Sequence, residues 1–306
     1  MAERLIRLGR WLLGLLILAL IVRSFSRNWQ ELQGQSVAWT FRPLPAIGSV
    51  AVIWLMYAML IEAWRRMLAG WGGDLPPMEA ARIWIVSSLG KYIPGKVWAV
   101  AGMALMAREA GVAPWAATAS AIILQALAVG TGAAVAALFG TSILARRTPE
   151  LVPLLWLAGT ASIAGVGLLL YPPVTKRLLA LARLGADAPS PRTGPLLLGV
   201  VANAIAWLGY GTALWLLARA VLPDQHLALG AAIAGFAASY VAGLLALFAP
   251  GGLLIREGLL VLMLQDSIGL GAATALAIAS RVLLTITELG AAVPFLLVRR
   301  GPTRAG

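Results

Sequence analysis

Long apolar stretches separated by short polar segments make up most of this chain. Six of them are candidates for membrane-spanning helices, at roughly 8–23, 44–64, 113–140, 151–171, 195–218 and 270–297. A helix needs about 20 mainly apolar residues to cross a bilayer and satisfies its own backbone hydrogen bonds there. The pattern therefore predicts an all-α polytopic membrane protein with about six transmembrane helices. No small-x-small cleavage site follows the first stretch, so we expect an uncleaved helix.

Two further apolar regions, at about 80–107 and 228–265, are each interrupted by a helix-breaking sequence. The breaks are Pro94 and Gly95 in the first region, and Pro250, Gly251 and Gly252 in the second. The arms of the first region, 81–89 and 97–107, are too short to cross a bilayer, so we expect a re-entrant helical hairpin. The first arm of the second region is long enough to span alone, which leaves both a re-entrant and a fully spanning course open.

The two breaks are spaced as an internal repeat. One constant offset relates Pro94 to Pro250, Gly102 to Gly258 and Thr131 to Thr287. Matched hydrophobic segments interrupted by Gly and Pro are typical of transporters whose site lies near the bilayer midplane. We therefore interpret the chain as two related halves that each contain a broken hairpin.

The distribution of basic residues predicts the topology. If the N-terminus is cytoplasmic and both broken regions enter and leave on one side, most Lys and Arg residues fall in cytoplasmic segments, as the positive-inside rule requires. Both termini are then cytoplasmic, and the two hairpins enter from opposite sides, which gives an inverted repeat. We expect one membrane domain over 1–306, divided into a first half (1–145), a connecting helix and linker (146–194) and a second half (195–306).

Composition agrees with this class and excludes several functions. Hydrophobic residues make up 60% of the chain and charged residues 12%, with a mean hydropathy of +0.88, which excludes an ordinary soluble domain. The chain has no Cys, and its one His, His226, lies in a polar turn. The sequence contains no nucleotide-binding motif and no metal-ligand cluster. We therefore expect no enzyme activity, no cofactor, no metal and no nucleic-acid partner.

Several charged residues fall at membrane depth around the breaks, where a Lys or Arg costs roughly 2.5–3.5 kcal/mol on insertion scales. The cations are Lys91, Lys96, Arg256 and Arg281, and the acids are Glu257 and Glu288. Gln125 follows Pro94 by as many residues as Arg281 follows Pro250. Excess positive charge inside a bilayer favours an anionic ligand such as a lipid phosphate. The candidate substrate-binding residues are these seven and Tyr92, and the candidate hinge residues are those of the two breaks.

Structural interpretations of the same residues stay open at this stage. The long Lys side chains can extend to the interface. Arg256 can pair internally with Glu257 or Glu288. A Pro-Gly break can be a simple kink without a substrate.

The segments around the breaks resemble those of the lysylphosphatidylglycerol synthase transmembrane-region family, also called the flippase-like domain. The resemblance is carried by residues 88–98 (SLGKYIPGKVW) and 249–258 (APGGLLIREG) and extends over nearly the whole chain. Many members have Leu-Pro-Gly-Arg followed by Gly-Glu at the first break, whereas here Lys96 takes the basic place and the acid is missing. The resemblance implies movement of lipids between leaflets. Members that synthesise lysyl-lipid carry a soluble synthase domain, which this chain lacks, so we do not expect synthesis.

The sequence thus predicts a flippase or scramblase that moves an anionic phospholipid or a polyprenyl-phosphate-linked lipid by alternating access. The predicted location is a bacterial or archaeal cytoplasmic membrane. One alternative is an accessory subunit of a glycosyltransferase that acts on polyprenyl-linked sugars. Another is an integral enzyme that uses Glu257 or Glu288 on a lipid phosphate. A homo-oligomer and a glycosyltransferase partner both stay open.

Overall fold

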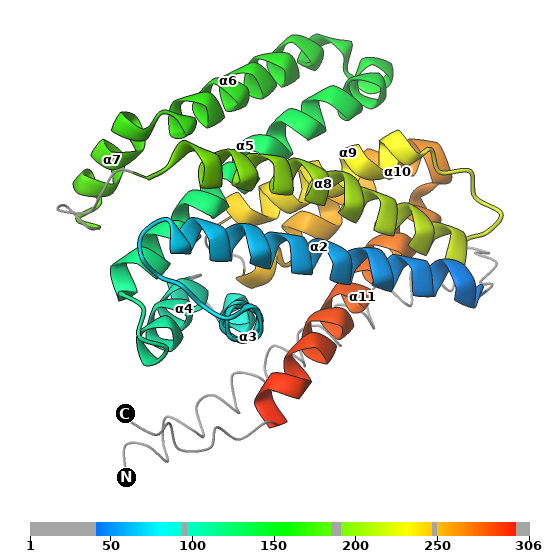
Figure 1. Cartoon of the computed structure of the whole chain (residues 1–306). Coiled ribbons are helices and arrows are strands. Elements are labelled where there is room, and N and C mark those ends of the chain that lie inside the picture. The colour runs from blue at the N-terminus through cyan, green and yellow to red at the C-terminus, as the bar shows by residue number, and fades with distance from the viewer. Residues whose placement is uncertain (1–40, 94–96, 185–190, 247–249, 298–306) are drawn as a thin grey trace.

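The computed structural model describes residues 41–93, 97–184, 191–246 and 250–297, and the regular structure in these ranges is helical (Figure 1). The helices are α2 (Pro43–Ala69), α3 (Pro77–Ser88), α4 (Val97–Glu109), α5 (Pro114–Arg147), α6 (Val152–Leu170), α7 (Pro172–Leu181), α8 (Thr193–Val221), α9 (Leu229–Leu245), α10 (Ile255–Ile268) and α11 (Leu270–Leu297). Short 3-10 turns are η1 (Leu89–Tyr92), η2 (Pro149–Leu151) and η3 (Pro250–Gly252).

Within the described ranges, five helical segments are long and apolar enough to cross a membrane. They are Pro43–Ala69, Pro114–Arg146, Pro149–Leu170, Thr193–Val221 and Leu270–Leu297. These segments match five of the six predicted spans and confirm the class of all-α integral membrane protein. The remaining predicted span, 8–23, lies outside the described residues.

Proline and glycine set the ends of several helices. Pro43, Pro77 and Pro114 occupy the first turns of α2, α3 and α5, where the missing N–H costs no hydrogen bond. Gly269, with φ of 80°, separates α10 from α11 in a conformation that glycine adopts without strain. The prolines therefore mark where these helices begin, and Gly269 allows the turn between α10 and α11.

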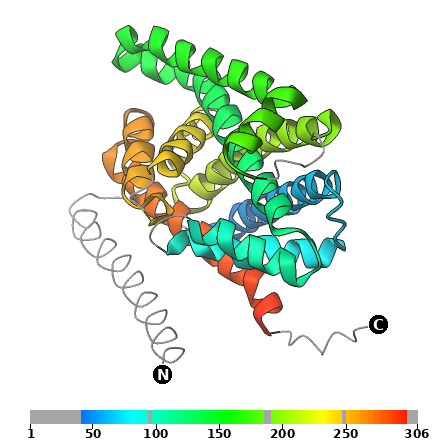
Figure 2. The same ribbon diagram turned by 90° about the vertical axis from the view of Figure 1, so that its left-hand side faces the viewer.

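The interior consists of two hydrophobic clusters joined through α2, α5 and α8. One cluster centres on α8, α9, α10 and α11 and contains Trp207, Phe236 and Leu276. The other centres on the end of α2 with α3, α4 and α5 and contains Trp64 and Ile83. Helix α2 packs along α8, and α6 lies along α5 at one edge of the molecule in both views (Figures 1 and 2).

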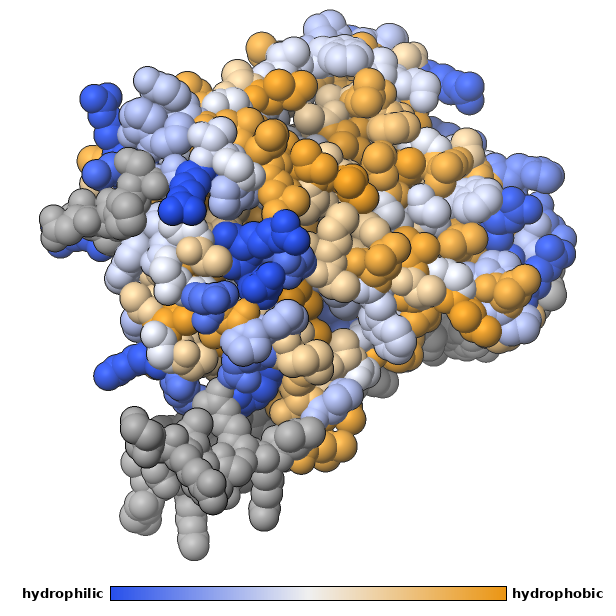
Figure 3. All heavy atoms as spheres, in the orientation of Figure 1, coloured by the Kyte–Doolittle hydropathy of each residue, from blue (hydrophilic) through white to orange (hydrophobic). Residues whose placement is uncertain are grey.

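The surface is that of a lipid-exposed protein. Hydrophobic residues cover a broad area of the face in Figure 3, whereas hydrophilic residues gather on its left part and at its right margin. Large apolar side chains stay exposed along the candidate spans, among them Leu55 in α2, Leu157 in α6 and Ile286 in α11. In water such a surface would aggregate, so the exposed side chains fit a hydrocarbon environment.

Both broken regions fold as pairs of short helices. Helices α3 and α4 pack against each other around the first break, and α9 and α10 do so around the second. Helices α3 and α4 have 12 and 13 residues, so each is only about 18–20 Å long and cannot cross a core of about 30 Å alone. The turns η1 and η3 contact each other, so the segment that directly precedes the first break lies against the second break, although the two are far apart in the sequence.

Glycine at the second break permits an unusually close approach of the two arms. Gly252 has φ of 70°, and a Cβ atom there would lie 2.8 Å from the Cα atom of Gly243 in α9. Gly258, in the first turns of α10, has no atom within 4 Å of a Cβ position. The backbone at Gly252 thus has no room for a side chain, whereas that at Gly258 has.

We therefore expect Gly252→Ala to destabilise the protein by about 1–3 kcal/mol, through overpacking and left-handed backbone strain. Gly258→Ala is the matched control, and it should be neutral or slightly stabilising because a helix interior favours Ala. The measurement is the thermal unfolding of both variants in detergent. Equal melting temperatures for the two variants would contradict the packing described for the second break.

Candidate functional site

The charged residues predicted from the sequence gather where η1, η3 and α11 meet. Arg281 and Glu288 lie two turns apart and therefore face the same side of α11. Arg281 faces the second break, and Glu288 faces the first. Helix α11 thus contacts η1 through Glu288 and the second break through Arg281.

Glu288 is the acceptor at the first break. Its Oε1 atom accepts from Lys91 Nζ at 2.5 Å, and its Oε2 atom accepts from the Tyr92 hydroxyl at 2.6 Å. Tyr57 of α2 donates its hydroxyl to Oε1 at 3.3 Å. The Glu288 side chain is 10% exposed and that of Lys91 is 30% exposed. The carboxylate is therefore held behind Lys91, which is the more accessible partner.

Arg281 ties α11 to the second break. Its Nη1 atom donates to the backbone carbonyl of Gly251 at 2.8 Å and to Glu257 Oε1 at 3.2 Å. The other oxygen of Glu257 accepts from the backbone N–H of Leu254 at 2.7 Å, at the start of α10. Glu257 thus both caps α10 and neutralises Arg281. Arg281 Nε is buried and has no hydrogen-bond partner in the described structure.

Arg256 differs from the other two cations because it has an aromatic and not an acidic environment. It is 7% exposed, and its guanidinium carbon lies 4.7 Å from the ring centroid of Tyr240 and 5.1 Å from that of Phe236. None of the described carboxylates lies within salt-bridge distance of Arg256. Cation–π contacts of this kind contribute about 0.5–2 kcal/mol but do not neutralise the charge.

An aromatic cluster extends from Arg256 toward Glu288. Phe236 stacks on Tyr240 and on Tyr210, with ring centroids 5.6 and 5.5 Å apart. Tyr210 packs at 6.2 Å on Tyr57, which reaches Glu288. These rings come from α2, α8 and α9 and form a continuous series of aromatic contacts between Arg256 and Glu288.

The structure brings together most of the candidate residues. Lys91, Tyr92, Gly251, Arg256, Glu257, Arg281 and Glu288 all take part in the contacts above. Gly252 forms the close contact with α9, and Pro250 opens η3. Lys96, Pro94 and Gly95 lie outside the described residues. Gln125 is exposed on α5 and has no hydrogen bond to the described members of this site.

Sequence reasoning missed the aromatic residues of the site. Tyr57, Tyr240 and Phe236 looked like ordinary residues of apolar helices, and only their packing gives them a role. The sequence interpretation that pairs Arg256 with Glu257 or Glu288 also differs from the observed pairing. Both acids bind other cations, because Arg281 and Lys91 approach them from α11 and η1.

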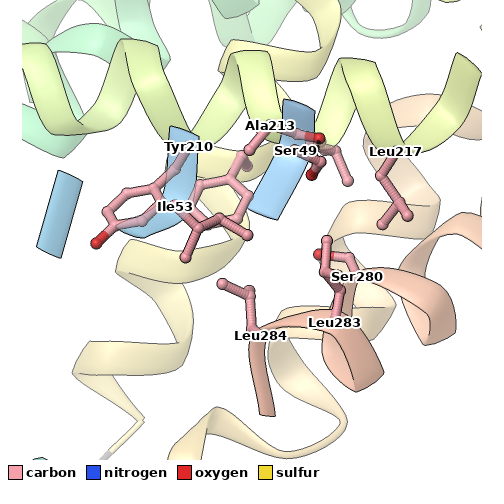
Figure 4. Close-up of a pocket in the computed structure, with 10 residues that line it drawn as sticks. Ser49, Ile53, Tyr210, Ala213, Leu217, Ser280, Leu283 and Leu284 are labelled. Carbon is pink, nitrogen blue, oxygen red and sulfur yellow. Dashed lines mark hydrogen bonds between the residues drawn. The ribbon is translucent and has the colours of Figure 1, made fainter. Parts of the chain in front are cut away.

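A small, mostly apolar pocket lies between α2, α8, α9 and α11 (Figure 4). Tyr210 and Phe236 line it together with Ser49 and Ser280. The Ser49 hydroxyl donates to the backbone carbonyl of Ala213 at 2.7 Å, so its polarity is satisfied within the protein. None of the residues that line the pocket carries a charge.

The described residues contain no group of three or more His, Asp or Glu side chains placed to hold a metal ion. No known protein-family profile matches the chain, and no curated protein is significantly similar to it.

Removal of the hydrogen bond that Tyr92 donates to Glu288 tests the geometry of η1 directly. Tyr92→Phe removes one donor to a buried carboxylate, and we expect a loss of about 1.5–3 kcal/mol in unfolding free energy. Tyr171→Phe is the control, because Tyr171 is 60% exposed at the end of α6. Thermal unfolding in detergent compares the two variants. A Tyr92→Phe variant as stable as Tyr171→Phe would show that the hydroxyl does not hold Glu288.

Proposed function

We propose that this protein is a lipid transporter of the flippase or scramblase kind, which moves a phosphate-bearing anionic lipid between leaflets. The observation that carries the proposal is Arg256, a buried cation without a carboxylate partner among the described residues. An unpaired charge in an apolar interior is expensive and is usually functional. An anionic ligand supplies the missing partner, and a phosphate is the common anion of a bilayer.

The proposal includes two re-entrant hairpins, α3–η1–α4 and α9–η3–α10, in an inverted repeat. In support, the order of long helix, broken helix pair and long helix occurs twice, as α2 to α5 and as α8 to α11. The contact between η1 and η3 fits two hairpin tips that meet from opposite sides of a membrane. Inverted repeats with broken helices build alternating access around a central site.

The two salt bridges made by α11 suggest how lipid binding is coupled to movement of the hairpins. Lys91–Glu288 and Arg281–Glu257 hold the two breaks to one helix when no substrate is present. A phosphate that binds Arg256 competes with Glu288 and Glu257 for Lys91 and Arg281, and it weakens both salt bridges. The breaks then separate toward one leaflet or the other, as a gating step requires.

Two alternatives predict different behaviour. An accessory subunit of a polyprenyl-linked glycosyltransferase pathway would dock the lipid without moving it. A lipid-modifying enzyme would place Glu257 or Glu288 on the substrate, but both carboxylates are already bound to cations in this structure. The observed geometry therefore favours binding and movement over catalysis.

The test is leaflet exchange by the purified protein in vesicles that contain a fluorescent anionic phospholipid. Quenching by external dithionite removes the signal of the outer leaflet, and further decay reports exchange. Exchange above that of protein-free vesicles supports the transporter. Absence of exchange, with folded protein and both a phospholipid and a prenyl-linked lipid, would reject it in favour of the accessory subunit. Formation of a modified lipid without any partner would favour the enzyme.

A further inference from the structure

Helix α7 begins where the candidate span α6 ends. Leu170 is the last residue of α6, and α7 starts at Pro172 after the extended residue Tyr171, so the chain changes direction between the two helices (Figure 1). Tyr171 is 60% exposed, and tyrosines of membrane proteins gather where hydrocarbon meets water. With 10 residues, α7 is only about 15 Å long and cannot cross a bilayer. It therefore follows the membrane boundary directly.

One side of α7 fixes the helix to the protein. Thr175 is 1% exposed and donates its hydroxyl to the backbone carbonyl of Leu169 at 2.6 Å. Leu179 is 7% exposed and belongs to the hydrophobic cluster that contains Trp64. After the helix, the backbone N–H of Leu184 donates to the carbonyl of Leu179 at 2.9 Å, which closes the helix end. These contacts set the rotation of α7 about its axis, so its other sides have defined directions.

A second side of α7 is apolar and uncovered. Leu178 and Leu181 are 47% and 80% exposed, and Val174 precedes them by four and seven residues on the same side of the helix. Along the chain they follow the exposed apolar side chains of α6, among them Leu168, which is 58% exposed. Apolar side chains that stay uncovered at the end of a candidate span fit the boundary of the hydrocarbon core.

The third side of α7 is basic. Lys176 and Arg177 are exposed, and their side of the helix lies roughly a third of a turn from each of the other two. No described carboxylate lies within salt-bridge distance of either residue. The sequence from 171 to 192 contains four basic residues and one acid, Asp187. This segment is therefore net positive whichever cation Asp187 approaches.

We propose that α7 is an interfacial amphipathic helix that binds the anionic lipid surface of the bilayer. Leu178 and Leu181 enter the hydrocarbon boundary, and Lys176 and Arg177 bind the phosphates of anionic headgroups. Apolar burial and attraction between basic residues and anionic lipids together hold such helices in the plane of a membrane. The positive-inside prediction places α7 at the cytoplasmic surface. The inference does not depend on lipid transport, since none of these residues takes part in the contacts at the two breaks.

A fluorescent probe on α7 tests the apolar side, and the absence of Cys from the chain makes a single labelled cysteine specific. Leu181→Cys in the full chain is labelled with bimane and reconstituted into vesicles of phosphatidylcholine and phosphatidylglycerol. Brominated acyl chains quench from the hydrocarbon, and iodide quenches from water. We expect brominated lipid to quench this probe about as well as one at Leu157→Cys, which is 64% exposed in the middle of α6.

Two other results for the Leu181 probe would overturn the inference. Quenching by iodide without quenching by brominated lipid would place this side of α7 in water. Quenching by neither agent would show that protein covers it, for example a second copy of the chain.

The headgroup preference around the same probe tests the basic side. Brominated phosphatidylglycerol and brominated phosphatidylcholine, compared at equal mole fraction, quench in proportion to their local concentrations. We expect the anionic lipid to quench the Leu181 probe at least about twofold more strongly, because basic residues near the surface concentrate anionic lipids. Lys176→Gln/Arg177→Gln should abolish this difference. Both residues are exposed, so the unfolding temperature of the variant should stay the same.

Arg42→Gln/Arg219→Gln is the matched control for the loss of two positive charges. The backbone N–H of Arg42, at the start of α2, donates to the carbonyl of Ala220 near the end of α8, so the two arginines lie together and outside α7. This variant should keep the preference. A preference that is absent without the substitutions, that survives Lys176→Gln/Arg177→Gln, or that the control also loses would overturn the role of the basic side.

Discussion

Replacement of Arg256 by Gln is expected to weaken binding of an anionic lipid by about tenfold or more without unfolding the protein. Hydrogen bonds to charged groups contribute about 1.5–3 kcal/mol, which corresponds to roughly tenfold or more in affinity. Removal of Arg256 leaves no acid without a partner, because Glu257 and Glu288 are paired with Arg281 and Lys91. The unfolding temperature of the lipid-free protein should therefore stay the same or rise.

The measurement is the increase in unfolding temperature that an added anionic lipid produces, since a ligand of the native state stabilises it in proportion to its occupancy. Arg256→Lys keeps the charge and should retain part of the effect. Arg219→Gln is the control for general loss of positive charge. If Arg256→Gln responded to the lipid like the wild type, Arg256 would not bind the anion. If it unfolded at a much lower temperature without lipid, the arginine would have a structural role.

Glu288→Ala is expected to have the largest effect on stability, a loss of about 3–5 kcal/mol. The substitution removes the acceptor of three donors, Lys91, Tyr92 and Tyr57, and leaves a partly buried cation without its partner. Breaking a buried ion pair from one side costs this much because the desolvated partner is left uncompensated. The loss of unfolding free energy therefore measures how strongly Glu288 of α11 holds Lys91 and Tyr92 of η1.

Two variants make this prediction specific, and thermal or denaturant unfolding in detergent compares them. Glu62→Ala also removes a carboxylate that pairs with arginines, but the Glu62 side chain is 36% exposed, so the loss should stay below about 1 kcal/mol. The double variant Lys91→Met with Glu288→Leu replaces the pair by apolar groups and should recover most of the stability. Equal losses for Glu288→Ala and Glu62→Ala would contradict the buried pair.

Much of the fold follows from hydropathy alone. The spans near 44–64, 113–140 and 270–297 correspond to α2, α5 and α11, because a run of about 20 apolar residues has few alternatives in a membrane. The ends differ by several residues, and α5 continues to Arg147, well past the predicted boundary. Hydropathy identifies the apolar centre of a helix and gives little information about its polar ends.

The site could be predicted only in part. Charged residues beside helix breaks are conspicuous in an apolar sequence, so Lys91, Arg256 and Glu288 could be selected without a structure. Their pairing could not, because it depends on how η1, α10 and α11 pack, and these elements are far apart in the sequence. The repeat position of Gln125 predicts a place in the site, but that position on α5 is exposed. The sequence also gave no reason to place Phe236 and Tyr240 around Arg256.

If the charged residues near the two breaks move an anionic lipid across the bilayer, their removal must slow that movement. The most direct measurement is the rate of leaflet exchange of a fluorescent anionic phospholipid in vesicles, for the wild type and for the Lys91→Ala/Arg256→Ala variant at equal protein per vesicle. We expect exchange by the wild type and a rate at least about tenfold lower in the folded variant, because two charge-assisted contacts to the lipid are missing. Equal exchange rates for the two proteins would contradict it.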